Sequence, residues 1–261
     1  MYPGAMGVSK TMKLPSEFDL IPYATGTLPG RRWLVLAPHP DDETLGPGAT
    51  LAAAARCGVD VHVIVASDGG RQGEPTVRRA ETARAMVELG LGEPEFFSFE
   101  DRGLAGAGVR VRAAVAAALA RTSPDLVLVT SPVDLHPDHR VLARAVQSAV
   151  RRLTWGGLRY RGPAWIAAYE VTTPLRPNLL TDCDATWEAK RRAALCHGSQ
   201  IAVRPYVEVM DALGLLRSMT LDGVGRAEAF FLAPAARVAR WSIRQWAAEM
   251  GSAAAWRRVV G

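Results

Sequence analysis

The chain has 261 residues, 49% of them hydrophobic and 22% charged, a composition typical of a globular protein with a large core. Its formal net charge of +5 is a modest excess, and no basic run is interleaved with aromatic residues, which argues against a nucleic-acid-binding groove. Solvated helix faces account for the arginines, with an anionic substrate or partner as the alternative.

The cysteines and the hydropathy pattern indicate in which cellular compartment the protein is located. The three cysteines, Cys57, Cys183 and Cys196, are not in CxxC spacing and indicate neither a disulfide framework nor a thiolate metal site. The first residues lack the continuous apolar stretch of a secretory signal, and no apolar run reaches the ~18 residues that a membrane helix needs. We therefore expect a reducing, cytoplasmic location and no membrane span.

Strands and helices are predicted to alternate along the chain after an irregular lead-in over residues 1–30. In chain order we expect strand 32–37, helix 44–56, strand 59–66, helix 77–89, strand 95–99, helix 109–121, strand 126–130, helix 140–153 and strand 164–169. The last third is less regular, with helices over 187–196, 207–219 and 236–250 and a strand over 226–232.

This alternation predicts an α/β fold, a Rossmann-like, mostly parallel sheet with helices on both faces. We expect a single domain over residues 31–261. Right-handed crossovers place all the loops from strand to helix at one edge of such a sheet, and that edge is where open α/β sheets bind their ligands.

Two short segments rich in His and Asp follow the first and fourth predicted strands. Residues 37–43 read APHPDDE and residues 136–139 read HPDH, so three of the five histidines lie beside acidic residues. His39 and Asp42 can converge on one ion from a loop that contains proline, and His139 can add a third ligand. Such a set suits a borderline metal such as Zn²⁺, and three protein ligands leave a position open for catalysis.

Other polar residues of these segments suit the chemistry of a metal-activated water. Such chemistry needs a base that takes a proton and a group that stabilises an oxyanion, and Asp41 and His136 are available beside the predicted ligands. Asp138 lies between two histidines and could orient one of them. An Asp just before a helix is also typical of an N-cap, which is the alternative for Asp138.

The two segments, their order and the strands before them resemble the PIG-L/LmbE family of zinc-dependent N-acetylglucosaminyl de-N-acetylases. The resemblance spans about residues 32–153, with weaker matches to about residue 231. Residues 46–50 read GPGAT where many members of the family read GCGGT, a change that alters packing at the start of a helix and not the ligands. The third glycine of a GxGxxG fingerprint is absent, so we expect no dinucleotide site.

The resemblance assigns a role to each of the five residues named first. It implies that His39, Asp42 and His139 hold the metal, which is Zn²⁺ by default, with Fe²⁺ or Co²⁺ as alternatives. It implies that Asp41 is the general base. It also implies that His136 stabilises the oxyanion or acts as an acid; the sequence does not decide whether Asp41 or His136 protonates the leaving amine.

Further segments match the family and suggest substrate contacts. The segment SDGGRQGEP resembles its glycine-rich loop, and Arg78 and Glu81 fit its R-x-x-E, in which the Arg contacts the sugar; an i,i+3 ion pair is the alternative. Asp101 matches an Asp that binds sugar hydroxyls, with a turn or cap role as the alternative. The segments CHGSQ and RAEAF also resemble the family, and we assign them no chemistry.

The resemblance implies that an N-acetyl group is hydrolysed from an N-acetylglucosamine-like sugar of a small-molecule glycoconjugate. The Ala- and Arg-rich, Lys-poor composition is typical of a GC-rich bacterial genome and favours a thiol-pathway intermediate or a natural-product glycoside. Two alternatives stay open: a metal-dependent amidase that acts on a non-sugar amide, and a non-catalytic module that binds sugar or metal. The presence of both Asp41 and His136 disfavours the module. The sequence leaves the oligomeric state open.

Overall fold

The computed structural model describes residues 24–155 and 162–251, so most of the predicted lead-in lies outside the described residues. In this part of the chain, eight strands form one sheet in the order β1-β7-β8-β6-β5-β2-β3-β4. Neighbouring strands are parallel, except that β8 runs antiparallel to β6 and β7. The predicted mostly parallel sheet is confirmed. The strands are β1 Ala24–Thr25, β2 Arg32–Ala37, β3 Asp60–Ser67, β4 Glu95–Phe99, β5 Leu126–Thr130, β6 Trp165–Tyr169, β7 Leu179–Asp182 and β8 Ala227–Pro234.

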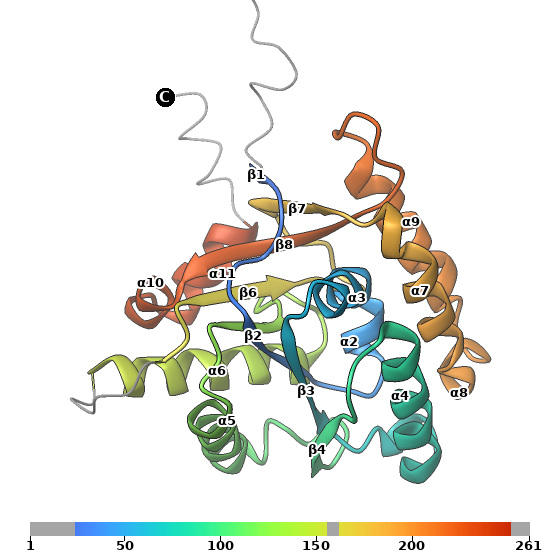
Figure 1. Ribbon diagram of the computed structural model, residues 1–261. Coiled ribbons are helices and arrows are strands. Elements are labelled where there is room, and N and C mark those ends of the chain that lie inside the picture. The colour runs from blue at the N-terminus through green and yellow to red at the C-terminus, as the bar shows by residue number, and fades with distance from the viewer. Residues whose placement is uncertain (1–23, 156–161, 252–261) are drawn as a thin grey trace, which may run out of the picture.

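Helices cover both faces of the sheet, as predicted (Figure 1). The side chains of β2 alternate between two buried cores: Leu34 and Leu36 belong to the core under α5, α6, α10 and α11, and Val35 belongs to the core under α3, α4, α7 and α9. None of the described helices is both long and apolar enough to cross a membrane. The helices are α2 Asp42–Leu45, α3 Gly48–Arg56, α4 Pro75–Leu89, α5 Gly108–Thr122, α6 Pro137–Trp155, α7 Asp184–Leu195, α8 Gly198–Ile201, α9 Tyr206–Ser218, α10 Ala235–Arg240 and α11 Ile243–Gly251, with a 3₁₀ turn, η1, at Gly70–Gln72.

The predicted helix over residues 44–56 is two helices, α2 and α3, so its predicted continuity is wrong. Pro47 has no backbone N–H to donate within a continuous helix and separates the two. Gly46 lies so close to Tyr169 that an added Cβ would be 2.5 Å from the Cδ2 atom of the ring. The break leaves α2 as one short turn that begins at Asp42, the predicted carboxylate ligand.

The predicted helix over residues 236–250 is likewise two helices, α10 and α11. Ser242 Oγ accepts a hydrogen bond from Gln245 N at 3.1 Å, and Gln245 Oε1 accepts one from Ser242 N at 2.7 Å, a reciprocal cap that starts the second helix. Sequence reasoning also missed β1, β7 and α8. These elements have two to four residues each, which is too few to show a periodic pattern.

The sheet brings the two His/Asp segments together because β2 and β5 are direct neighbours. The two strands pair in parallel, with Leu36 opposite Val129 near their carboxyl ends. The chain that leaves β2 and the chain that leaves β5 therefore emerge side by side at one edge of the sheet. Residues distant in sequence thus face one another there.

A buried ion pair closes the break between α2 and α3. Lys190 Nζ donates to Gly46 O at 2.7 Å and contacts Glu228 Oε1 at 2.6 Å. The Glu228 carboxylate also accepts hydrogen bonds from the N–H groups of Ala49 and Thr50, at 2.8 Å each, at the start of α3. Lys190 of α7 thereby holds the carbonyl of Gly46, the residue that caps α2, and Glu228 of β8 holds amides in the first turn of α3.

We expect Glu228→Gln to lower the free energy of unfolding by about 3 kcal/mol, because Lys190 would remain charged and buried without a carboxylate partner. Urea unfolding measures this change. The matched control is Glu88→Gln, which breaks the exposed ion pair between Arg192 and Glu88 (2.8 Å) and should change stability by less than about 0.5 kcal/mol. Equal losses in the two variants would contradict the role given to the buried pair.

Candidate active site

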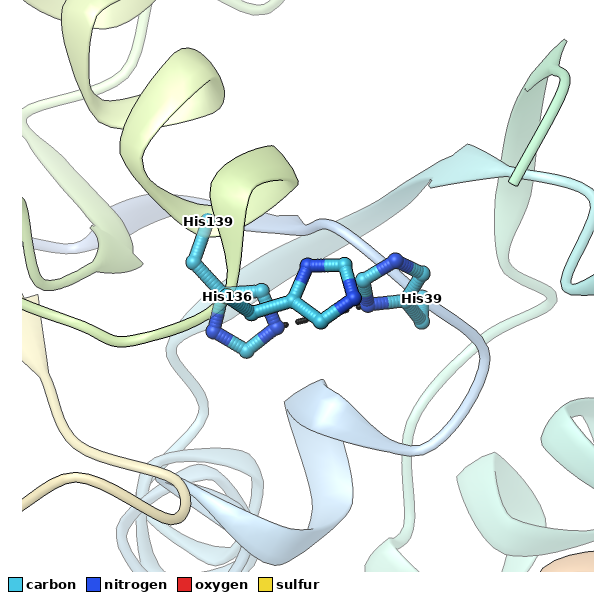
Figure 2. Close-up of side chains that lie close together, drawn as sticks. All are labelled: His39, His136 and His139. Atoms are coloured by element: carbon cyan, nitrogen blue, oxygen red, sulfur yellow. Dashed lines mark hydrogen bonds between the residues drawn. The ribbon is translucent and has the colours of Figure 1, made fainter. Parts of the chain in front are cut away.

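The three predicted metal ligands lie close enough together to share one ion. Asp42 Oδ2 is 3.1 Å from His39 Nδ1 and 3.2 Å from His139 Nε2, and the two ring nitrogens are 3.3 Å apart. Zinc bonds of 2.0–2.2 Å in a tetrahedral arrangement separate the ligand atoms by about 3.3 Å. Two imidazoles and one carboxylate are also the donors that such a metal prefers, so the residues present fit a divalent cation. Figure 2 shows His39, His136 and His139 side by side; His39 lies in the loop after β2, and His139 lies in the first turn of α6, which follows β5.

Each of the two ligand histidines turns its other ring nitrogen toward carboxylates. His139 Nδ1 is 3.3 Å from Asp134 Oδ2. His39 Nε2 is 3.4 Å from both Asp101 Oδ1 and Asp138 Oδ2. Carboxylates in this position orient a metal-binding imidazole and raise its basicity. Sequence reasoning missed Asp134, and its place in the loop directly after a buried strand was the only available signal.

The surrounding carboxylates decide the charge of the two histidines. Burial disfavours the imidazolium form, but the carboxylates around the ring, Asp101 first, outweigh burial and raise the pKa of His39 well above its usual value. At His139 the negative charges of Asp42 and then Asp134 likewise outweigh burial, and they raise the pKa of the ring to about 9. The site therefore concentrates negative charge, which a bound cation would offset.

Asp138 and Asp101 both lie against His39. Helix α6 begins at Pro137, so Asp138 lies in its first turn and not at the N-cap. Its side chain is fully buried beside the His39 ring, which favours the orienting role over the capping role. Asp101 Oδ2 accepts a hydrogen bond from Arg71 N at 3.2 Å, and Asp101 lines the same cavity as His39.

His136 has a fixed tautomer. The backbone N–H of Asp138 donates to His136 Nδ1 at 3.2 Å, so the neutral ring carries its proton on Nε2. Partial burial, followed by the neighbouring His39 and His139, lowers the pKa of His136 below its usual value. The neutral ring is therefore favoured, with an N–H available to donate.

Asp41 has a strained backbone, with φ 145° and ψ −26°, a region that residues with a Cβ rarely adopt. Its N–H donates to Glu43 Oε2 at 3.2 Å, and its Oδ2 accepts from the Arg78 guanidinium at 3.2 Å. Burial and the negative charge of Asp42 raise the pKa of Asp41 to about 7, although Arg78 opposes the rise. A carboxylate tuned in this way is suited to exchange protons near neutral pH.

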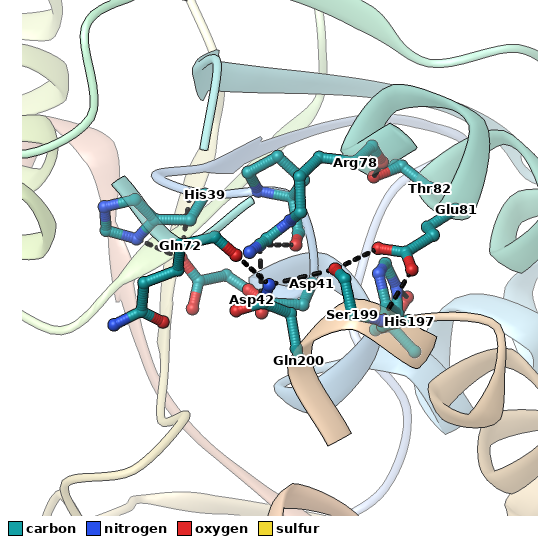
Figure 3. Close-up of polar contacts among 12 residues, drawn as sticks. His39, Asp41, Asp42, Gln72, Arg78, Glu81, Thr82, His197, Ser199 and Gln200 are labelled. Atoms are coloured by element: carbon teal, nitrogen blue, oxygen red, sulfur yellow. Dashed lines mark hydrogen bonds and ion pairs between the residues drawn. The ribbon is translucent and has the colours of Figure 1, made fainter. Parts of the chain in front are cut away.

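Arg78 and Glu81 are not paired with each other in the described part of the chain. Arg78 (Figure 3) is 2% exposed, and its guanidinium also donates to the carbonyl oxygen of Pro40. Glu81 instead accepts two hydrogen bonds from Ser199, from its N–H and its hydroxyl, at 2.7 Å each. Arg78 still lines the cavity, so a substrate contact stays a prediction for it.

A cavity of about 140 Å³ lies at the carboxyl edge of the sheet, and the predicted site residues that line it are His39, Asp41, Asp42, Arg78, Asp101, His136 and His139. Its other walls include side chains that sequence reasoning did not single out: Gln72, Arg102, Thr172, Gln200 and Tyr206. A larger cavity of about 930 Å³ lies along the start of β2 and the end of α3. The described residues that line this larger space include none of the predicted site residues, so size does not identify the reaction site here.

The comparisons with known proteins agree with the geometry. A family model described as GlcNAc-PI de-N-acetylase, PIG-L, matches residues 34–150, which contain both His/Asp segments. A 1D-myo-inositol 2-acetamido-2-deoxy-alpha-D-glucopyranoside deacetylase from Rhodococcus opacus is 28% identical, covering 67% of this chain and 83% of the relative.

Two solved structures show the same fold. A conserved protein from Thermus thermophilus has a TM-score of 0.69 and 33% identity, covering 76% of this chain and 93% of its own. A 4-carboxy-2-hydroxymuconate hydratase from Pseudomonas putida has a TM-score of 0.66 at 22% identity, covering 78% of this chain and 96% of its own, and is similar in fold alone. On the family model and the Thermus relative, the chain belongs to the PIG-L family.

Proposed function

We propose that this protein is a metal-dependent N-deacetylase that hydrolyses the acetamide of an N-acetylglucosamine-like sugar in a small-molecule glycoconjugate. The convergence of the ligand atoms of His39, Asp42 and His139 on one point beside Asp41 carries the proposal. The name of the Rhodococcus relative supports the substrate class. We propose residues 31–261 as the single domain that carries the activity, and a cytoplasmic location.

His39, Asp42 and His139 would hold the metal. Their nitrogen and oxygen donors suit Zn²⁺ first, with Fe²⁺ or Co²⁺ as alternatives. The chemistry that such an ion supplies when bound is Lewis acidity, which lowers the pKa of water and polarises an amide carbonyl. Three protein ligands are typical of catalytic sites, whereas structural zinc sites use four.

Asp41 is positioned to move the proton of the attacking water. Its pKa of about 7 lets it take that proton near neutral pH and give it up again. The resulting hydroxide adds to the acetyl carbonyl carbon, and the carbon–nitrogen bond then breaks to give acetate and a free amine. We assign the transfer of that proton to the amine nitrogen to Asp41, because the neutral His136 would become an imidazolate if it gave up its Nε2 proton.

His136 supports the same reaction from the other segment. Its Nδ1 accepts the Asp138 amide proton, so the Nε2–H is the group that can donate to the carbonyl oxygen as negative charge develops there. The lowered pKa keeps the ring neutral and makes it a hydrogen-bond donor at neutral pH without a prior charge.

Replacing Asp41 with Ala should separate metal binding from catalysis. We expect the variant to keep the metal content of the wild type while kcat falls by about 10²–10⁴, because a positioned general base contributes about that factor. Metal analysis and the rate of acetate release measure the two quantities. Undiminished deacetylation by Asp41→Ala would rule out the proposed base.

Removal of the metal should abolish activity reversibly. Treatment with a chelator is expected to stop acetate release, and one equivalent of Zn²⁺, Fe²⁺ or Co²⁺ should restore it. His139→Ala should bind metal far more weakly and should not recover. The matched control is His62→Ala, since His62 lies on β3 and contacts Glu95 at 3.1 Å, remote from the site. Full activity in the chelated protein would contradict metal dependence.

A substrate screen tests the reaction class. Metal-loaded protein would be incubated with N-acetylated sugars and glycosides and with non-sugar acetamides. A third set would contain 4-carboxy-2-hydroxymuconate, which the structurally similar hydratase is named for. We expect the mass loss of one acetyl group in the sugar set alone. Turnover confined to the non-sugar acetamides, or addition of water to 4-carboxy-2-hydroxymuconate, would replace the proposed function with that reaction.

A further inference from the structure

A directed chain of hydrogen bonds runs from a buried carboxylate to the wall of the active-site cavity. It begins at Glu81 on α4, whose side chain is 3% exposed. Glu81 accepts the Ser199 N–H at its Oε1 and the Ser199 hydroxyl at its Oε2, at 2.7 Å each. A carboxylate accepts hydrogen bonds and does not donate them, so the Ser199 hydroxyl proton points to Glu81.

The direction of this first bond fixes the next one. Because the Ser199 oxygen has given its only proton to Glu81, it acts as an acceptor toward Gln200 Nε2, 3.0 Å away. Gln200 Nε2 also donates to the carbonyl oxygen of Gln72 at 2.8 Å, and that oxygen has no proton to give. Both N–H groups of the Gln200 amide are therefore committed (Figure 3).

This network identifies the nitrogen of the Gln200 amide and leaves its oxygen without a donor in the described part of the protein. The nitrogen and oxygen of a glutamine side chain are told apart by their partners, and here the two acceptors identify the nitrogen. The remaining atom is the carbonyl oxygen, Oε1. Gln200 lines the cavity together with His39 and Asp41, although the residue is 2% exposed. Among the described residues, none donates to Gln200 Oε1.

An amide oxygen held in this state has a preference for its ligand. The described residues give this oxygen no donor, so a substrate group with an O–H can make a hydrogen bond there that the protein itself leaves unmade. A carboxylate or phosphate group would be repelled by the same oxygen. The cavity wall thus selects a neutral hydroxyl-bearing ligand at this point, as a sugar provides.

We propose that Gln200 is a substrate-positioning residue whose Oε1 accepts a hydrogen bond from a hydroxyl of the sugar, and that Glu81 acts through Ser199 to hold that oxygen in place. The inference rests on the proposed deacetylase function and adds a polar contact that the metal ligands do not supply. It gives a role to the segment CHGSQ, which lies at residues 196–200.

The first test replaces Gln200 with Leu, which removes the oxygen and keeps a similar volume. For an N-acetylglucosaminide, we expect KM to rise about tenfold while kcat falls less than threefold, since the lost bond positions the substrate and takes no part in proton transfer. Gln147→Leu is the matched control. Gln147 is also a buried glutamine that donates to two backbone carbonyls, those of Val238 and Trp241, but it lies on α6 outside the cavity. It should lower stability and leave KM unchanged.

The second test uses the direction of the chain. Glu81→Gln replaces a group that only accepts hydrogen bonds with an amide that can also donate. The Ser199 hydroxyl can then accept from residue 81 and donate to Gln200, and the Gln200 amide can flip so that its nitrogen and oxygen exchange places. We expect KM to rise about threefold in Glu81→Gln alone and not to rise further when Glu81→Gln is added to Gln200→Leu. Additive effects would show that Glu81 acts independently of Gln200 and would overturn the chain.

The third test measures the ratio of kcat/KM for two substrates, which a purely structural role of Gln200 would leave unchanged. Wild-type protein should lose about tenfold in kcat/KM on the one monodeoxy analogue of the N-acetyl sugar that lacks the contacted hydroxyl, and Gln200→Leu should treat that analogue and the parent sugar alike. Gln200→Met takes the place of the leucine variant if that variant does not fold.

The outcomes separate the two proposals. An active wild type together with an unchanged KM in Gln200→Leu overturns the role of Gln200 and leaves the deacetylase function standing. A wild type that releases no acetate from any N-acetyl sugar overturns the function and this inference with it.

Discussion

The parallel pairing of β2 with β5 is the constraint on which the site depends. Each strand delivers one His/Asp segment to the carboxyl edge, and the register that puts Leu36 opposite Val129 sets the depth at which the segments emerge. A one-residue slip would turn the side chains of a whole strand to the opposite face and separate the ligands. Both strands are fully buried at this edge, so packing on two faces holds the register.

Around that edge the protein gathers carboxylates that would repel one another without compensation. Arg78 offsets part of this charge at Asp41, and the histidines offset part of it at Asp42. The buried pair of Lys190 and Glu228 acts at a distance, because it holds the break after α2 and so the turn that presents Asp42. The ion pair of Lys190 and Glu228 therefore stabilises the fold, and Arg78 and the histidines compensate the carboxylates of the site.

The sequence was sufficient for the alternation of strands and helices and for the convergence of His39, Asp42 and His139, since both follow from local patterns and one topological rule. The break at Pro47 was readable in principle, but a strong run of alanines after it masked the interruption. Asp134 and Gln200 were not predictable, because their roles depend on partners distant in the chain. Short strands such as β7 form through pairing with β8 and not through their own sequence.

The positive φ of Asp41 has a consequence for how this protein could be stabilised. Glycine tolerates a positive φ better than Asp does, so Asp41→Gly would relieve backbone strain. The same change would leave the Arg78 guanidinium, which is 2% exposed, without its carboxylate partner, and that loss opposes the relief of strain. A thermostable form of this protein must therefore gain its stability elsewhere in the fold.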